Sequence, residues 1–254
     1  PVNTELLRNM TKILDHRGPD AANTIKVGPI GFGHARLKVI DLIGGQQPVV
    51  NKKSGQALIF NGEIYNFRAL QPAGFQSKSD TETLFEILRF DNTDWLNQLN
   101  GMFAFAAWDH AAQELLLVRD RVGIKPLHYT IAGNQFLFSS EIKSLLLHPA
   151  TTRAVNREAI PEYLGFRSIP EPNTAFENIF SVPPGHTLRI SVRNPKPKIE
   201  CWWSGGSNPA ITAELDLHGT PEDQLEAALG KSIDYRLITD VPVGTYNSGG
   251  IDSN

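Results

Sequence analysis

Cysteine is almost missing from this sequence, because Cys201 is the single one in 254 residues. One thiol can form neither an internal disulfide framework nor a cysteine-based metal cluster, so both are excluded within the sequence given. A large excess of charge is missing as well. The 24 basic and 27 acidic residues leave a net charge of -3, which provides no basic field for nucleic acid and no charged stripe for a membrane surface.

Long apolar runs are also missing. No run approaches the roughly 18 residues that a membrane-spanning helix needs, and the first residues, PVNTELLRNM, lack the apolar core of a signal peptide. We therefore expect no membrane segment and a cytoplasmic location. What the sequence does contain is 41% hydrophobic and 20% charged residues, a composition that suits one large domain or two smaller ones.

Short apolar runs separated by turn-rich segments extend from about residue 28 to residue 145 and predict strands of an antiparallel sheet system. Between them, three segments carry apolar residues at helical spacing, and two of these begin with Ser-x-x-Glu or Ser-Glu helix-start signals. Strands and helices together predict a layered α+β domain. The predicted strands are 30–40, 56–65, 101–109, 114–120 and 134–142, and the predicted helices are 3–16, 79–88 and 140–149.

The last part of the chain has a different pattern. Residues 193–210 are rich in Pro, Lys, Gly and Ser, which predicts a hairpin or a linker. Residues 220–238 predict a helix with Thr220 as N-cap and Pro221 in its first turn. The segment VPVGTY that follows is expected to be a strand, and SGGIDS comes next. A strand, a glycine loop and then a helix are the order that opens a nucleotide-binding α/β domain.

Seven motifs occur in a fixed order, and together they resemble the glutamine-hydrolysing asparagine synthetases over essentially the whole chain. They are HRGPD (16–20), GHARLKVID (33–41), NGEIYN (61–66), SDTE (79–82), GMFAFAAWD (101–109), RDRVGIKPL (119–127) and SGGIDS (248–253). The resemblance implies an N-terminal-nucleophile hydrolase domain, built as an α/β/β/α sandwich, that releases ammonia from glutamine. It also implies that the beginning of a nucleotide-binding α/β synthetase domain follows.

By this resemblance, residues 1–190 form the glutamine amidotransferase domain, 191–219 a hairpin or linker, and 220–254 the start of the ATP-binding synthetase domain. The implied function is an ATP-dependent, amide-forming ligase. It would transfer the ammonia of glutamine to an adenylated carboxylate, by default aspartate to give asparagine. The implied partners are L-glutamine, ATP with Mg²⁺ and the carboxylate acceptor, and homodimers are common in the family, so we expect a homodimer.

Binding free glutamine requires a cation for its α-carboxylate, acceptors for its α-ammonium and two donors for the oxyanion. Arg36 suits the carboxylate, although a surface salt bridge is the alternative for a single arginine. Asn61 and Gly62 offer adjacent N–H donors, whereas Asn-Gly alone also fits a hairpin turn. Glu63 and Asp80 could accept from the ammonium, and Asp80 could instead cap a helix. The resemblance implies that glutamine is bound by Arg36, Leu37, Val39, Asn61, Gly62, Glu63 and Asp80, with Asn61 and Gly62 forming the oxyanion hole.

The segment SGGIDS carries the nucleotide prediction. Its two glycines let backbone N–H groups gather around phosphate, and its serines add hydroxyl donors. A Ser-Gly-Gly sequence in isolation is most often a simple loop, as we expect for the similar SGGS at 204–207. The resemblance implies that ATP is bound by Asn247, Ser248, Gly249, Gly250, Asp252 and Ser253, and that Asp252 lies near Mg²⁺.

The nucleophile implied by the resemblance is a cysteine at the mature N-terminus, which uses its own α-amino group as the base. The sequence opens with Pro1, and the surroundings of Cys201, ECWW, are typical of a structural strand. We therefore expect the nucleophile about ten residues ahead of Pro1 and the rest of the synthetase domain after Asn254. Two alternatives are a β-lactam synthetase-like enzyme with an inert N-terminal domain and a non-catalytic glutamine-binding module. The residues expected to bind glutamine argue against the β-lactam synthetase-like enzyme, because an inert domain needs no glutamine pocket.

Overall fold

The strands sort into three antiparallel sheets, with orders β11-β10-β6-β5-β4-β3, β8-β7-β9 and β1-β2. The computed structural model describes residues 2–206 and 219–251. The strands are β1 (Ala21–Val27), β2 (Ile30–Arg36), β3 (Val49–Val50), β4 (Ala57–Ile64), β5 (Gly101–Asp109), β6 (Glu114–Arg119), β7 (His128–Ala132), β8 (Gln135–Ser139), β9 (Ile179–Ser181), β10 (His186–Ser191) and β11 (Lys198–Cys201). The sheets therefore reach beyond the range of 28–145 in which the sequence predicted strands.

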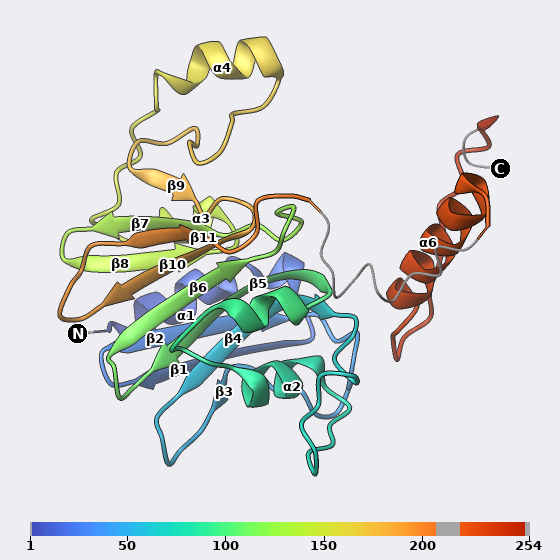
Figure 1. Ribbon diagram of the computed structural model, residues 1–254. Coiled ribbons are helices and arrows are strands. Elements are labelled where there is room, and N and C mark those ends of the chain that lie inside the picture. Colours follow the sequence, from blue (N-terminus) through green and yellow to red (C-terminus); the bar gives the residue numbers. More distant parts are fainter. Residues whose placement is uncertain (1, 207–218, 252–254) are drawn as a thin grey trace.

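The helices lie outside these sheets (Figure 1). They are α1 (Thr4–Lys12), α2 (Asp80–Ile87), α3 (Ile142–Leu145), α4 (Ala159–Phe166) and α6 (Pro221–Arg236), with short 3-10 helices η1 (Asp15–Arg17) and η2 (Asp94–Gln98). Two helix starts follow the capping signals of the sequence, whereas the Ser-Glu signal at 140–141 provides no side-chain cap, because α3 begins after Glu141 without such a hydrogen bond. The Ser79 hydroxyl accepts from the Glu82 N–H at the start of α2, and Thr220 forms a reciprocal capping box with Asp223 at the start of α6.

The fold has four layers, and two hydrophobic clusters lie on the two faces of its six-stranded sheet. The first joins α2 and η2 to one face of the six-stranded sheet, where Leu84 and Leu96 pack with Phe103 and Phe105. The second joins the opposite face of that sheet to the two smaller sheets, and α1 and α3 lie against the smaller sheets from outside. The order is α/β/β/α, so the predicted sandwich is confirmed.

The pattern of β5 explains why the two clusters differ. Successive side chains of a strand point to opposite faces. Phe103 and Phe105 therefore face the helical layer, while Ala104 and Ala106 face the second layer of sheets. Small residues on this second face leave room between the sheets, and the cavity described below occupies that room.

Small residues also bring α1 close to β2. A Cβ atom at Gly33 would lie 1.9 Å from the Thr11 hydroxyl oxygen, and one at Gly31 would lie 2.9 Å from Leu7 Cδ2. Glycine at these two alternate positions lets the helix rest on the strand, while Phe32 between them is buried in the second cluster. The sequence GFGH thus fixes α1 against the outer face of the sandwich.

The segment after α6 differs from the prediction. Residues 241–246, VPVGTY, were expected to form a strand, but they adopt no regular secondary structure. Val243 and Tyr246 are exposed. A strand needs a neighbour to accept and donate its backbone hydrogen bonds, and none of the strands in the described part of the chain pairs with this segment. The apolar composition of the segment was therefore insufficient to make it a strand here.

Candidate functional site

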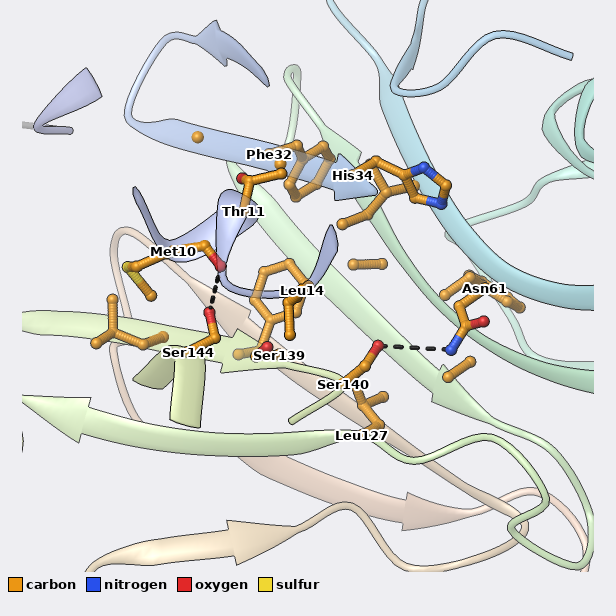
Figure 2. A pocket seen from close by; sticks show the side chains of 18 of the residues that line it. Met10, Thr11, Leu14, Phe32, His34, Asn61, Leu127, Ser139, Ser140 and Ser144 are labelled. Carbon is orange, nitrogen blue, oxygen red and sulfur yellow. Dashed lines mark hydrogen bonds between the residues drawn. The ribbon is translucent and has the colours of Figure 1, made fainter. Parts of the chain in front are cut away.

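A cavity of about 1130 Å³ lies between the sheets and is lined by residues of both β2 and β8. These two strands are the terminal strands of their small sheets, and Phe32 of β2 contacts Phe138 of β8 edge to face at 6.0 Å. Figure 2 shows Phe32 and His34 on one side of the cavity and Ser139, Ser140 and Leu127 on the other. The lining includes every residue that the sequence predicted to bind glutamine: Arg36, Leu37, Val39, Asn61, Gly62, Glu63 and Asp80.

Arg36 ends β2 and is only 7% exposed. Its guanidinium donates to three backbone carbonyls of the following loop, those of Gly44 (2.7 Å), Ile40 (3.1 Å) and Asp41 (2.9 Å). These bonds use three of its five N–H groups. No carboxylate within residues 2–206 and 219–251 forms an ion pair with it. The alternative of a surface salt bridge therefore does not describe Arg36, which holds the loop of residues 37–44 beside the cavity.

Asn61 and Gly62 lie in the middle of β4, opposite Ala104 and Phe103 of β5. The hairpin turn that the pair could have formed is therefore excluded. Asn61 Nδ2 donates to the Ser140 hydroxyl at 3.5 Å across the cavity (Figure 2). Gly62 has φ of 148°, and a Cβ atom there would lie 2.0 Å from the Met102 carbonyl oxygen. Only glycine fits at this position.

Glu63 and Asp80 bring two carboxyl groups to the same cavity. Asp80 opens α2 behind the N-cap Ser79 and is 5% exposed, and it accepts from the N–H groups of Ile64 (3.2 Å) and Thr81 (2.7 Å). Burial raises the pKa of Asp80 to about 6, with a further contribution from Glu63, although these hydrogen bonds lower it. Burial likewise raises the pKa of Glu63, against the charges of Lys125 and Arg236. The pair is suited to receive a cation.

Lys125 also lines the cavity, although it is not among the residues predicted to bind glutamine. The motif RDRVGIKPL places it there through Asp120, which is 1% exposed. Asp120 accepts from the N–H groups of Ile124 (2.9 Å) and Lys125 (2.9 Å) and closes the loop between β6 and β7. Burial lowers the pKa of Lys125, while the Glu63 carboxylate acts to raise it. No local sequence signal marks Lys125, because its place at the cavity depends on the hydrogen bond that its N–H donates to the buried Asp120.

The HRGPD motif contributes a charged cluster at the rim of the cavity. Glu141 accepts from His16 (2.9 Å) and Arg17 (3.1 Å), and Lys143 lies 3.1 Å from its second oxygen. Burial acts to raise the pKa of Glu141, but the hydrogen bonds from His16, Lys143 and Arg17 outweigh it and hold this pKa at about 2. Glu141 stays ionised and ties α3 to η1. His16 and Arg17 therefore shape the rim of the cavity through Glu141.

Two polar atoms in the wall of the cavity are buried without a hydrogen-bond partner among the described residues: His34 Nδ1 and Trp108 Nε1. The other ring nitrogen of His34, Nε2, lies 2.9 Å from the Phe60 carbonyl oxygen and donates to it. Burial lowers the pKa of His34 to about 4, so the ring is neutral near pH 7 and Nδ1 is an acceptor. Sequence reasoning did not select His34, because it is a single histidine within an apolar strand.

Cys201 lies at the exposed end of β11, on the edge of the six-stranded sheet. It is not among the residues that line the cavity. The neighbouring Trp202 stacks on Phe103, and its Nε1 donates to the Arg119 carbonyl at 3.2 Å. The ECWW sequence is therefore part of an edge strand and its packing, as expected.

The predicted nucleotide loop lies only partly within the described residues. The N–H groups of Gly249 and Gly250 bond to Asn247 Oδ1 (2.7 Å) and Ser248 Oγ (3.3 Å). Asp252 and Ser253 lie outside the described residues, so the structure says nothing about them. In residues 2–206 and 219–251 no cluster of His, Cys, Asp and Glu could hold a metal ion, and no helix there is long and apolar enough to cross a membrane.

Comparison with known proteins gives a domain family and several relatives. Residues 2–203 match a family described as a glutamine amidotransferase domain. Asparagine synthetase (glutamine-hydrolyzing) 3 of Bacillus subtilis is 35% identical over 98% of this chain and 41% of its own length. Amidase chyE of Penicillium rubens is 34% identical over 98% of this chain and 37% of its own length. A solved structure, glutamine phosphoribosylpyrophosphate amidotransferase from B. subtilis, is 21% identical with a TM-score of 0.47, covering 68% of this chain and 34% of that one.

The match to the domain family extends over most of the chain, and the chain therefore belongs to the glutamine amidotransferase domain family. It spans about two fifths of the length of the curated relatives named above, 41% and 37% respectively.

Proposed function

We propose that the protein of which this chain is part hydrolyses glutamine and transfers the ammonia to a carboxylate activated by ATP, by default aspartate to give asparagine. One observation carries the proposal. The residues that the sequence predicted for glutamine come from β2, β4, α2 and the loop after β2, and all of them line the same cavity. An interior that had no ligand would not need buried carboxyl groups and an arginine around a cavity of this volume.

Each end of glutamine has suitable partners in this cavity. Asp80 and Glu63 can accept from the α-ammonium, and Arg36 retains two N–H groups for the α-carboxylate. Asn61 Nδ2 and the Gly62 N–H would stabilise the oxyanion that forms when the side-chain amide is attacked. Preorganised donors of this kind typically contribute about 3 to 4 kcal/mol each to transition-state stabilisation.

The nucleophile of this proposal is the cysteine that the resemblance implies ahead of Pro1. The cavity could take an extended segment that carries it. Val2 lines the cavity, and so do residues of β2 and β8, each of which is an edge strand of its sheet. The acceptor His34 Nδ1 and the donor Trp108 Nε1 would match an N–H and a C=O of such a segment. Ten extended residues reach about 33 Å, which is sufficient to cross a cavity between two sheets.

ATP and Mg²⁺ belong to the proposed second half of the reaction. The N–H groups of Gly249 and Gly250 each bond to a side-chain oxygen of their own loop, and a phosphate oxygen could replace either acceptor. Ser248, Gly249 and Gly250 would hold the phosphates, and Asp252 would hold the metal ion. Bound MgATP would supply the activation of the acceptor carboxylate as an adenylate. The residues of this chain then bind and orient the phosphates.

A second candidate function is a glutamine-driven amide synthesis with another acceptor. The relatives do not share one named activity, since the similarity to a protein named amidase chyE, at 34% identity, nearly equals the similarity to the asparagine synthetase, at 35%, and this leaves the acceptor open. Both candidates use the same glutamine cavity and differ in the acceptor. A non-catalytic glutamine-binding module is the third possibility, and it would bind glutamine without releasing ammonia.

The test uses the full-length protein with glutamine, MgATP and aspartate, and it measures glutamate, pyrophosphate and asparagine. All three products are expected. Glutamate and pyrophosphate that form only with a different carboxylate would favour the second candidate, and glutamine binding without glutamate would favour the third. Asp252→Asn should abolish ATP–pyrophosphate exchange and leave glutamine hydrolysis largely intact, because it removes the charge that holds the metal ion. Wild-type exchange in this variant would contradict the assignment of Asp252.

A further inference from the structure

The segment that follows α6 holds the loop beside the cavity from outside. The Asp240 N–H donates to the Val39 carbonyl at 2.9 Å, and the Thr239 hydroxyl donates to the same carbonyl at 3.3 Å. In return, the Asp41 N–H donates to Asp240 Oδ2 at 2.8 Å. Two consecutive residues thus make three hydrogen bonds to a stretch nearly 200 residues earlier in the chain.

The same loop is held from the cavity side by Arg36, which donates to the carbonyls of Ile40 and Asp41. A peptide unit is planar and trans, so its C=O and N–H point in opposite directions. Because the Val39 carbonyl is fixed toward Thr239 and Asp240, the N–H of the next residue must point away from them. The two sets of bonds together determine how the backbone of residues 39–41 faces the cavity, which Val39 and Ile40 line.

The end of α6 is anchored independently of these bonds. The ring of Tyr235 stacks on Tyr65, with centroids 6.3 Å apart, and Arg236 lies 5.2 Å from the centroid of the Tyr65 ring. Ile238 packs against the first hydrophobic cluster. Tyr65 directly follows β4, which carries Asn61, Gly62 and Glu63. Thr239 and Asp240 therefore follow an anchored helix end, and their position beside the loop of residues 37–44 is fixed by those contacts.

We propose that Thr239 and Asp240 are positioning residues for glutamine binding, which hold residues 39–41 in the shape that Arg36 and the cavity require. The proposal rests on the proposed glutamine site. Asp240 stands eight residues ahead of Ser248, the first serine of the glycine loop, so the segment that leads into this loop also sets the affinity of the glutamine site. A displacement of the segment would alter glutamine binding without touching the glutamine itself.

The test compares Asp240→Ala with wild type in the full-length protein. Loss of one hydrogen bond of this kind should raise the KM for glutamine about threefold to tenfold, with kcat for glutamine hydrolysis unchanged. Ammonia-driven synthesis, which bypasses the glutamine site, should also be unchanged. Asp240→Asn retains an oxygen acceptor for the Asp41 N–H and should restore the KM. Asp234→Ala removes an exposed carboxylate from α6 and serves as the matched control.

Hydrogen exchange of the peptide that contains residues 37–44 provides a second measurement, which needs no catalysis. Exchange should be faster in Asp240→Ala than in wild type and normal in Asp240→Asn. An unchanged KM together with unchanged exchange would overturn the proposal. Equal loss of glutamine-driven and ammonia-driven synthesis would also overturn it, since Asp240 would then act on the nucleotide loop alone. If the wild type hydrolyses no glutamine, the proposed function fails, and the exchange measurement still decides whether Asp240 holds the loop.

Discussion

Asp80 should set the acid limit of glutamine hydrolysis. Burial raises the pKa of its carboxyl from 3.8 to about 6, and the neighbouring Glu63 contributes to the rise. The proposed contact between glutamine's α-ammonium and Asp80 is an ion pair only when the carboxyl is ionised. Because kcat/KM reports the ionisation of the free enzyme, we expect kcat/KM for glutamine to fall as the pH drops below about 6.

The magnitude follows from the same pKa of about 6. At pH 5 about one Asp80 carboxyl in ten is ionised, and at pH 4 about one in a hundred, so kcat/KM should fall about tenfold for each unit. The shift also affects stability. The pKa in the folded protein lies above the unfolded value, so stability falls as the pH rises from about 4 to about 6, and the ionised carboxyl costs about 3 kcal/mol above that window. A bound ammonium group offsets part of this cost.

The assay is kcat/KM for glutamine hydrolysis by the full-length protein between about pH 4.5 and pH 8. Asp80→Asn should lower kcat/KM at neutral pH and remove the decline that Asp80 causes at acid pH. Asp94→Asn removes one exposed carboxylate from η2 and controls for the general loss of negative charge. An acid limb that persists unchanged in Asp80→Asn would refute the assignment, and so would a wild-type profile that stays flat down to about pH 5.

Three further substitutions test other parts of the site. Arg36→Ala should reduce kcat/KM for glutamine about a hundredfold, roughly 2 to 4 kcal/mol, with ammonia-driven synthesis retained; equal loss of both activities would make Arg36 purely structural. Gly62→Ala should cost on the order of 3 kcal/mol in unfolding free energy, seen as a lower melting temperature, because its Cβ would collide with the Met102 carbonyl. Gly74→Ala, also at positive φ but with no atom within 4 Å of the added carbon, should be milder. His34→Phe removes the buried acceptor Nδ1 and should lower glutamine hydrolysis about tenfold; unchanged hydrolysis would show that nothing in the active protein bonds to that nitrogen.

Features decided by neighbouring residues were predictable from the sequence. Ser79 and Thr220 begin helices because a side-chain oxygen can satisfy an N–H group two or three residues later, and this requires no distant contact. The alternation of Phe and Ala in GMFAFAAWD likewise predicts a strand, and in β5 the Phe and Ala side chains lie on opposite faces. Such signals were sufficient for the layered fold class, and the ordered motifs then indicated the particular sandwich.

Features decided by distant residues were not predictable from local pattern alone. Asn61-Gly62 reads locally as a hairpin turn, yet the pair lies within β4, where the Met102 carbonyl leaves no room for a side chain at position 62. The segment 241–246 has a strand-like composition but no strand beside it among the described residues. All four residues of β11 are exposed, and the Pro, Lys, Gly and Ser residues around it suggested a hairpin or a linker; β11 is a strand because it pairs with β10.

Arg36 and Asp80 could be predicted as cavity residues because the resemblance implies a role in glutamine binding for each of them. Lys125 and His34 were not predicted because the role of each depends on its position in the folded structure. Lys125 reaches the cavity only because Asp120 closes its loop, and His34 matters only because one of its nitrogens is sealed from solvent without a partner. Neither the loop closure by Asp120 nor the burial of the His34 nitrogen can be recognised from a single sequence.

The packing of α6 has a practical consequence for dissecting the protein. The family match ends at residue 203, whereas Tyr235 still covers Tyr65 and Ile238 still fills a place in the first cluster. A recombinant fragment cut at the end of the match would expose the Tyr65 ring to water and lose the three hydrogen bonds that Thr239 and Asp240 make to residues 39–41. The fragment to express for crystallisation or for a stand-alone assay therefore extends past Asp240, and its boundary is set by the contacts of the folded chain.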